Sequence, residues 1–248
     1  MPPPRTLTGD AARMALARSR LMLLFSPALC LDRDPLAVLE AALPHLDAVQ
    51  VRPKPAGAGA AAPAPARETW EWSRRILDLL RGRTGSPLVL LVDDRVDVAF
   101  ALRAEGVAGV HLGQEDLEAS LARGILGAEA LIGLSTHDMQ QVAEAGELPV
   151  DYLGFGPVHA TPTKGYQLGL GSEACWIASE AARTPVFPIG GIDLANAQEL
   201  VRIGRSAVSS AILGAADPGR AARELRELLA GDEVSPGFRA GAASRPRS

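Results

Sequence analysis

Residues 88–116 read LVLLVDDRVDVAFALRAEGVAGVHLGQED and contain one complete structural unit. Two short apolar runs, Leu88–Val92 and Ala108–Leu112, flank an amphipathic stretch at Val96–Ala104. A strand, a helix and a second strand in this order predict a right-handed crossover between parallel strands. Polar residues follow both apolar runs directly, so the stretch also predicts where each strand ends.

The same unit recurs over most of the chain. Six further apolar runs predict strands at Leu21–Phe25, Asp47–Val51, Ala130–Ser135, Val150–Phe155, Pro185–Ile189 and Arg205–Ser209. Amphipathic stretches between strands predict helices, among them Thr69–Arg81, Met139–Ala145, Glu173–Ala182 and Leu194–Val201. Eight alternating units favour an α/β fold, a single (β/α)8 TIM barrel of roughly 250 residues, over an open sheet of about five or six strands.

The expected barrel occupies residues 21–230 of the 248. An Ala/Pro/Gly-rich insert at 53–66 follows the second strand and has the composition of a linker. We expect residues 1–20 to be disordered or to form an extra N-terminal segment. The polar tail at 231–248 is also expected to be disordered.

Composition narrows the classes of partner. Hydrophobic residues make up 47% of the chain, and the formal net charge is −4. This acidic balance argues against a protein that coats nucleic acid, although a local group of cations can still bind a small anion. The first residues contain no apolar signal region, and no run approaches the roughly 18 apolar residues of a membrane span. Cys30 and Cys175 match no metal-binding spacing, so we expect a reduced, cytoplasmic protein. From the charge and the lack of a long apolar run, we expect neither nucleic-acid nor membrane partners.

Two carboxylates follow neighbouring predicted strands. In barrels of this kind the chemistry lies at the carboxyl ends of the strands, where Asp94 and Asp116 would project with Glu115 beside them. Carboxylate oxygens suit Mg²⁺, which takes one or two carboxylates together with phosphate oxygens and water. Asp94 could instead cap the following helix, because aspartate is a favoured N-cap residue. Spacing alone leaves both interpretations open.

Cations reach the same predicted rim. Arg52 and Lys54 follow the second strand, and Lys164 lies in the loop after the sixth. Arginine grips a phosphate with two parallel hydrogen bonds, and lysine acts as a point charge. Three cations near two aspartates therefore indicate a site for a phosphorylated molecule.

Two turns of small residues follow the last two strands. Gly190-Gly191 and Ser209-Ser210 would leave backbone N–H groups uncovered where such barrels commonly bind phosphate. The histidines are weaker candidates for chemistry. His111 falls inside the fourth strand, which favours a satisfied histidine lining the barrel, and His137 begins the next helix or neighbours its cap.

Read together and in order, these segments resemble the thiamine phosphate synthase family from about Leu21 to Leu229. The resemblance rests on Gln50-Val51-Arg52-Pro53-Lys54, Asp93-Asp94-Arg95-Val96-Asp97, Gly109–Asp116, Ile132–His137, Asp151–Pro157, Thr161–Lys164, Ile189–Ile192 and Ser209–Ile212. It implies a transferase that joins hydroxymethylpyrimidine diphosphate to a thiazole phosphate and releases pyrophosphate. In that family the pyrimidine leaves as a stabilised cation, which the thiazole nitrogen then captures.

The resemblance also implies roles for matching residues. Gln50, Arg52, Lys54, Ser135 and Lys164 would hold the pyrimidine diphosphate, and all of these except Gln50 would also form the catalytic set. Asp94 and Asp116 would hold the Mg²⁺ cofactor. The thiazole phosphate would lie against Thr161, Thr163, Gly191, Ser209 and Ser210. Asp93 is also expected to bind substrate, although it departs from the family, which usually has an asparagine that faces the pyrimidine; an acid there could bind the pyrimidine differently or add to the metal site.

Three other interpretations compete. A thiazole tautomerase shares the barrel and the thiazole phosphate site, but it would have little use for the two aspartates and the Gln50–Lys54 set. An unrelated phosphosugar isomerase or lyase could use the same fold, since fold does not decide function. A non-catalytic homologue that binds phosphorylated ligands is compatible with Asp93 and with the insert. The sequence does not determine the oligomeric state, and it is compatible with a homo-oligomer.

Overall fold

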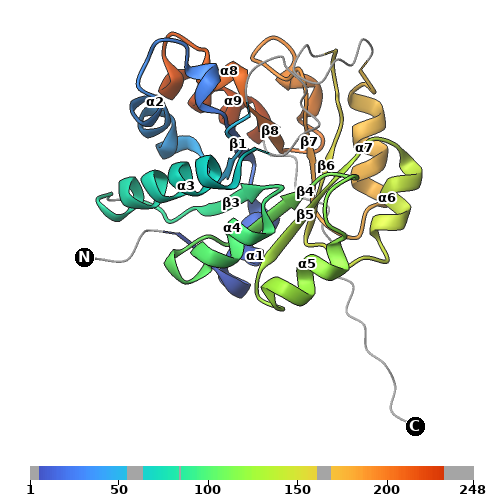
Figure 1. Cartoon of the computed structure of the whole chain (residues 1–248). Helices are drawn as coiled ribbons and strands as arrows, with labels where there is room; N and C mark the ends of the chain where they lie inside the picture. Colours follow the sequence, from blue (N-terminus) through green and yellow to red (C-terminus); the bar gives the residue numbers. More distant parts are fainter. Residues whose placement is uncertain (1–5, 55–63, 84, 161–168, 232–248) are drawn as a thin grey trace.

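The computed structural model describes residues 6–54, 64–83, 85–160 and 169–231. Within these residues eight parallel strands form one sheet in the order β7-β6-β5-β4-β3-β2-β1-β8. A bridge between Ile189 and Ala207 brings the two outer strands together. The strands thus form a nearly closed barrel with helices around it, a (β/α)8 fold as predicted (Figure 1). The strands are β1 (Leu21–Phe25), β2 (Ala48–Val51), β3 (Val89–Asp93), β4 (Gly109–Leu112), β5 (Leu131–Thr136), β6 (Tyr152–Phe155), β7 (Val186–Pro188) and β8 (Ser206–Val208).

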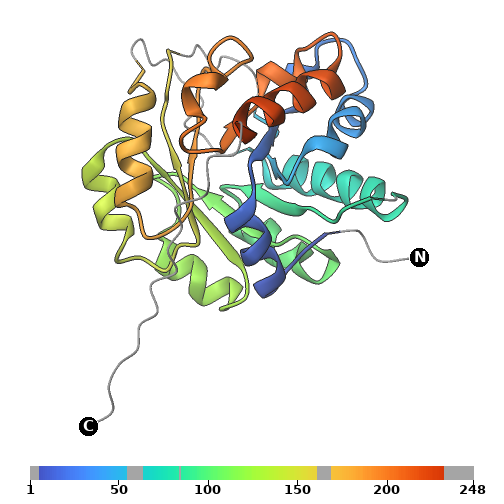
Figure 2. The same ribbon diagram turned by 180° about the vertical axis from the view of Figure 1, so that it is seen from behind.

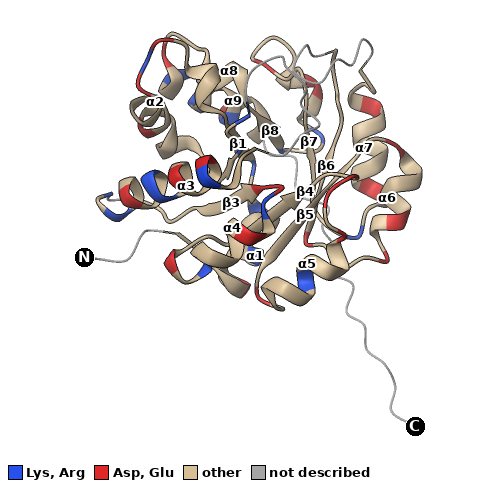
Figure 3. Cartoon of the chain, in the orientation of Figure 1, with Lys and Arg blue, Asp and Glu red and all other residues tan. Residues whose placement is uncertain are grey.

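Helices follow most strands and cover the outside of the barrel. In Figure 3 the ribbon positions coloured for Lys, Arg, Asp and Glu fall mainly on these helices and their loops, with both signs along α3. The α-helices are α1 (Gly9–Arg18), α2 (Pro35–Ala42), α3 (Ala66–Arg81), α4 (Val96–Leu102), α5 (Ala119–Leu126), α6 (Met139–Ala145), α7 (Ser172–Ala181), α8 (Ser210–Leu213) and α9 (Pro218–Ala230). Short 3-10 helices are η1 (Pro27–Cys30), η2 (Leu43–His45), η3 (Arg103–Glu105) and η4 (Ala197–Leu200).

The strands bury both of their faces. Leu21, Leu23 and Phe25 of β1 belong to the layer between strands and helices, while Met22 and Leu24 belong to the interior of the barrel. Burial on both sides explains why each strand reads as a continuous apolar run rather than as an alternating pattern. The interior is a packed core, so a ligand is confined to the ends of the barrel.

Helix α1 closes the amino end of the barrel. Its Ala12 and Leu16 are buried in the interior cluster, and Arg13 Nε donates to Asp151 Oδ1 at 2.7 Å, just before β6. Figure 2 shows this helix crossing below the strands. Residues 9–18 are therefore a folded addition to the barrel. Closure of this end leaves the carboxyl end as the open one.

The seventh unit differs from the prediction. The helix expected at Leu194–Val201 does not form, and this stretch contains only the 3-10 turn η4. Asp193 Oδ1 accepts from the Ala195 N–H at 2.8 Å, and Asn196 Oδ1 accepts from the Asp193 N–H at 2.9 Å. Such local side-chain bonds compete with the helical ladder and favour turns.

Several expectations concern residues outside those described. Positions 55–63 of the insert and 232–248 of the tail are among them. In the described part of the chain, no helix is both long and apolar enough to span a bilayer.

Candidate active site

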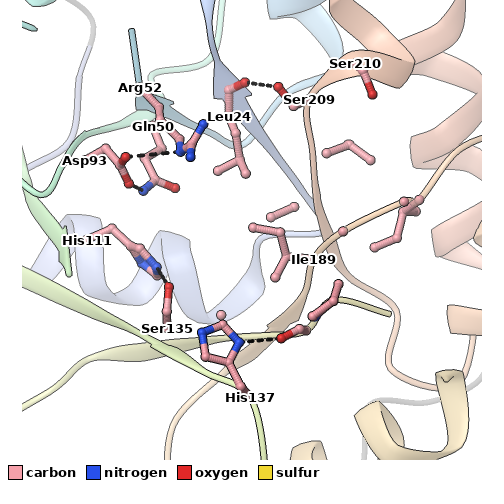
Figure 4. A pocket seen from close by; sticks show the side chains of 18 residues that line it. Leu24, Gln50, Arg52, Asp93, His111, Ser135, His137, Ile189, Ser209 and Ser210 are labelled. Atoms are coloured by element: carbon pink, nitrogen blue, oxygen red, sulfur yellow. Dashed lines mark hydrogen bonds and ion pairs between the residues drawn. The ribbon is translucent and has the colours of Figure 1, made fainter. Parts of the chain in front are cut away.

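A pocket opens at the carboxyl end of the barrel (Figure 4). Polar side chains come from β2 to β5, and small or apolar residues from β6 to β8 complete its wall. Its lining comprises Leu24, Gln50, Arg52, Asp93, His111, Ser135, His137, Gly154, Gly156, Pro157, Ile189, Gly190, Gly191, Ile192, Ala207, Val208, Ser209 and Ser210. Seven of the predicted site residues thus meet in one place, although they are spread over about 160 positions of the chain: Gln50, Arg52, Asp93, Ser135, Gly191, Ser209 and Ser210.

A cluster of polar and charged residues, which we call the charged side, comprises Gln50, Arg52 and Asp93 of the pocket wall together with Lys54, Asp94 and Asp116 next to it. At its centre the Asp93 carboxylate accepts from Gln50 Nε2 at 2.6 Å and lies 3.2 Å from Arg52 Nε. Both Asp93 and Gln50 are buried, at 6% and 3% exposure. A buried charge must be paired to be tolerated, so this carboxylate orients the two side chains beside it.

Lys54 connects Asp93 to the neighbouring carboxylate. Its Nζ lies 3.6 Å from Asp93 Oδ2 and 2.5 Å from Asp94 Oδ2. The lysine backbone is held in turn by Ser26, whose hydroxyl donates to the Lys54 carbonyl at 2.8 Å. The cation therefore sits between two buried carboxylates at the rim.

Asp94 does not act as the helix cap that its position allowed. The residue at the N-cap of α4 is Arg95, and no side chain caps that helix. Asp94 instead has a φ of 57°, in the left-handed region that few non-glycine residues adopt. Strained backbone of this kind is concentrated at functional sites, and here it turns the carboxylate toward Lys54.

Asp116 faces Asp94 from the loop after β4. Its Oδ2 accepts from the Gly113 N–H at 2.7 Å. Burial raises the pKa of this carboxyl and the nearby Asp94 raises it further, whereas the Gly113 N–H and Lys54 oppose the shift. The carboxylates of Asp94 and Asp116 are hard oxygen donors that repel each other in a partly buried place. A divalent cation such as Mg²⁺ between them would offset this repulsion. Among the described residues, no group of three or more His, Cys, Asp or Glu side chains gathers as a protein-only metal cage.

The two aspartates line a second hollow next to the pocket. This hollow lies toward α4 and α5, where Phe100, Leu117 and Ile125 contribute its apolar wall. The predicted metal pair is therefore beside the pocket, and the ion pairs of Lys54 join the two places.

The middle of the pocket wall carries two histidines whose rings form hydrogen bonds. His111 Nδ1 lies 3.0 Å from the Tyr152 hydroxyl, and its Nε2 lies 2.9 Å from Ser135 Oγ. His137 Nδ1 lies 2.6 Å from the Gly156 carbonyl. This agrees with the expectation of a barrel-lining His111, while His137 precedes α6, whose N-cap is Asp138.

The opposite wall, which we call the glycine side, consists of Gly190, Gly191, Ile192, Ser209 and Ser210. Within the described residues, the backbone N–H groups of Gly191 and Ile192 donate no hydrogen bond. Gly191 has a φ of 65°, and a Cβ there would lie 2.8 Å from the His159 Cβ. This turn thus needs glycine, and it leaves N–H groups for an anion.

Sequence reasoning missed some residues of the site. Tyr152 is buried behind His111, and Ile192 lines the pocket, yet no polar pattern marks either one. The predicted Thr161, Thr163 and Lys164 lie outside the described residues. The available signal for Tyr152 was Gly133 in the preceding strand, because a glycine inside a strand leaves space for a neighbouring ring and a Cβ there would lie 2.1 Å from Tyr152 Cζ.

The fold and the pocket define a class: a (β/α)8 barrel with a pocket lined by charged, polar and glycine residues at the carboxyl end of its strands. The chain belongs to the thiamine monophosphate synthase family, whose model matches residues 21–212. A thiamine-phosphate synthase from Azorhizobium caulinodans is 41% identical over 162 residues, which cover 64% of this chain and 74% of that protein. A solved thiamine phosphate pyrophosphorylase from Pyrococcus furiosus is 32% identical with a TM-score of 0.68, covering 88% of this chain and 96% of its own.

Other relatives are longer proteins. The thiamine-phosphate synthase of Gloeobacter violaceus is 40% identical over 227 residues, which are 90% of this chain and 61% of that protein. For the synthase of Synechococcus sp. strain CC9605 the match is 46% over 143 residues, 57% of this chain and 40% of the relative. The chain thus spans between about two fifths and three fifths of these two proteins.

Proposed function

We propose that the chain is a thiamine phosphate synthase. It would join 4-amino-2-methyl-5-hydroxymethylpyrimidine diphosphate to a thiazole phosphate and release pyrophosphate. The observation that carries this proposal is the pocket with two unlike walls. One presents fixed side-chain charges, and the other presents the Gly191 and Ile192 N–H groups, which donate to none of the described residues. Two anionic substrates can bind such a pocket at once, each against its own wall.

The charged side would hold the diphosphate. Arg52 is suited to a bidentate grip and Lys54 to a point contact, and Asp93 keeps both at the rim. Gln50 and Ser135 would contact the pyrimidine end of the same substrate. Fixed cations directed at a leaving group that gains negative charge lower the barrier to its departure.

Asp94 and Asp116 would hold Mg²⁺. When bound there, the ion would neutralise charge on the phosphate oxygens of the leaving pyrophosphate. Burial raises the pKa of Asp116 and the neighbouring Asp94 raises it further, and both effects support a cation between the two carboxylates.

The glycine side would bind the thiazole phosphate through the Gly191 turn, with Ser209 and Ser210 beside it. Thr161 and Thr163 are proposed for the same ligand, and Lys164 for the diphosphate. Substitution through a stabilised pyrimidine cation requires no covalent link to the protein. It requires that the two substrates be aligned and that water be excluded, which a packed barrel with one closed end supports.

We also propose a cytoplasmic location, with the two phosphorylated small molecules as partners and neither nucleic acid nor membrane. The net charge of −4 and two buried free cysteines, Cys30 and Cys175, support this.

The test is an end-point assay of purified protein with both precursors, with and without Mg²⁺, that detects thiamine phosphate. We expect product only when Mg²⁺ is present. Absence of product while the thiazole phosphate still binds by calorimetry would contradict the proposal and favour a tautomerase or a non-catalytic binder.

A further inference from the structure

Three polar side chains from adjacent strands form a chain of hydrogen bonds behind the pocket. Tyr152 of β6 contacts His111 of β4, and His111 contacts Ser135 of β5, at 3.0 and 2.9 Å. Only Ser135 and His111 line the pocket; Tyr152 lies deeper, at 1% exposure. Figure 4 shows the His111 ring directed at the Ser135 hydroxyl.

The direction of the first hydrogen bond follows from burial. Burial raises the pKa of Tyr152 well above its usual range, so the phenol keeps its proton. Among the described residues, His111 is the one hydrogen-bond partner of this hydroxyl. A buried donor without an acceptor costs about 1–3 kcal/mol. The phenol O–H therefore donates to Nδ1 of His111.

The second hydrogen bond is then determined as well. A neutral imidazole that accepts at Nδ1 carries its proton on Nε2, and so Nε2–H donates to Ser135 Oγ. In the described residues, His111 is also the one side-chain partner of the Ser135 hydroxyl. Since its oxygen already accepts a hydrogen bond, the proton of Ser135 is left to point into the pocket.

Glycines on the same strands make this arrangement possible. A Cβ at Gly133 would lie 2.1 Å from Tyr152 Cζ and 2.4 Å from His111 Nδ1. At Gly154 it would lie 3.2 Å from His111 Cε1. These are buried ring atoms that cannot move aside, so the two rings are held in the contact that the hydrogen bonds need.

We propose that Tyr152 and His111 are positioning residues that hold the Ser135 hydroxyl as a hydrogen-bond donor toward the substrate. The site would then select a substrate that presents an acceptor atom to Ser135, and reject an analogue with a donor there. The identity of that substrate as the pyrimidine diphosphate rests on the proposed function. The direction of the hydrogen-bond relay, from Tyr152 through His111 to Ser135, does not rest on it.

The direct test is the tautomer of His111, read from the ¹⁵N chemical shifts of the histidine rings in the wild-type protein at neutral pH. The signal is assigned by its loss in His111→Asn. We expect the Nε2–H tautomer, and a mixture of tautomers in Tyr152→Phe. An Nδ1–H tautomer or a doubly protonated ring in the wild type overturns the relay. This measurement needs no turnover, so it is independent of the proposed function.

The second test is a double-mutant cycle on kcat/KM for the pyrimidine substrate. Tyr152→Phe removes one oxygen atom and should lower kcat/KM about tenfold, as expected for one oriented hydrogen bond. In a Ser135→Ala background the same change should have no further effect, because the relay acts through that hydroxyl. Equal effects in both backgrounds would overturn the proposal.

The matched control is Thr136→Val, which removes a buried hydroxyl that donates to the Gly154 carbonyl at 3.1 Å, one position from Ser135. It should lower the Tm about as much as Tyr152→Phe while kcat/KM stays within about twofold. An equal fall in kcat/KM for both variants would reduce Tyr152 to a structural role. If the wild type forms no thiamine phosphate, the proposed function fails. The hydrogen-bond relay is then tested by the tautomer of His111 alone.

Discussion

The charged side and the glycine side face each other across one pocket, but they offer a ligand different parts of the protein. The charged side presents side-chain groups, such as the Arg52 guanidinium that Asp93 holds at 3.2 Å. The glycine side presents backbone N–H groups at Gly191 and Ile192, where the sequence supplies little more than the absence of a side chain. Both sides suit phosphate by different physical means.

This difference has a consequence for mutation. A side-chain group disappears when its residue is replaced, whereas a backbone N–H remains and can only be displaced or obstructed. We therefore expect the charged side to lose function when a group is removed, and the glycine side when an atom is added.

The largest effect is expected at Asp116. Asp116→Ala removes one of two proposed oxygen ligands and should lower kcat/KM by about 100-fold or more. The measurement is steady-state kinetics with Mg²⁺ titrated, and Glu115→Gln, which alters the exposed neighbouring carboxylate, is the control with near wild-type rates. Normal turnover of the alanine variant would refute the metal assignment.

Asp116 should also make the folding stability of the metal-free protein depend on pH. Because the pKa of Asp116 is raised in the folded protein, its contribution to stability is complete below the ordinary aspartate pKa and is lost as pH rises through the folded value. Metal-free wild type should therefore lose stability relative to Asp116→Asn over that pH range. Urea unfolding of both proteins from acid to neutral pH measures the difference, and a constant difference would contradict the sign.

Gly191→Ala should have the next largest effect. The new Cβ would need a φ of 65° and would lie 2.8 Å from the His159 Cβ and 3.0 Å from the Ala160 carbonyl oxygen. We expect the turn to shift and the affinity for the thiazole phosphate to fall about tenfold, with little change in the affinity for pyrophosphate. Calorimetry with each ligand separates the two; an equal loss for both would mean that the walls do not act independently.

Asp93→Asn should have a smaller effect than Gly191→Ala, and it should raise the affinity for a ligand rather than lower it. The amide can still accept from Gln50, but it no longer neutralises Arg52 and Lys54. Inorganic pyrophosphate should then bind about three- to tenfold more tightly, because the cations lose a competing carboxylate. The control is Asp10→Asn, at an exposed carboxylate that pairs with Arg13 of α1 at the amino end of the barrel. Weaker pyrophosphate binding in Asp93→Asn would show that the carboxylate mainly orients the cations.

The smallest effect is expected at Ser209. Its hydroxyl donates to the Leu24 carbonyl at 2.7 Å and so joins β8 to β1. Ser209→Ala should cost about 1 kcal/mol of unfolding free energy but change thiazole phosphate affinity less than about threefold. Chemical denaturation and calorimetry give the two values. A tenfold loss of affinity would place the hydroxyl itself on the ligand.

Much of the fold could be read from apolar runs alone. All eight predicted strands occur, and β1 has the predicted bounds Leu21–Phe25. The exception is instructive: Leu194–Val201 has helical periodicity, but Asp193 and Asn196 bond to nearby backbone and only η4 forms. Periodicity reports burial, and it does not weigh competing local hydrogen bonds.

The positions of site residues were predictable where polar residues follow a strand. The role of a residue was less predictable where it depends on a contact with a residue distant in sequence. Gln50, Arg52 and Asp93 were expected at the rim and are there. Asp94 was expected either to cap the helix or to bind a metal, and its ion pair with Lys54, which lies forty residues earlier, was visible only in the structure. Tyr152 looked like any core aromatic residue until its hydroxyl was seen against His111.

The sequence by itself determined the strand and helix order, the barrel and the rim on which the polar residues fall, because these depend on periodicity and on chain direction. Only the tertiary structure decided which rim residues touch, that α1 closes the amino end, and that Tyr152, His111 and Ser135 form one hydrogen-bonded chain. Those facts depend on the register between strands that are distant in sequence, and a linear pattern carries no information about distance across a barrel.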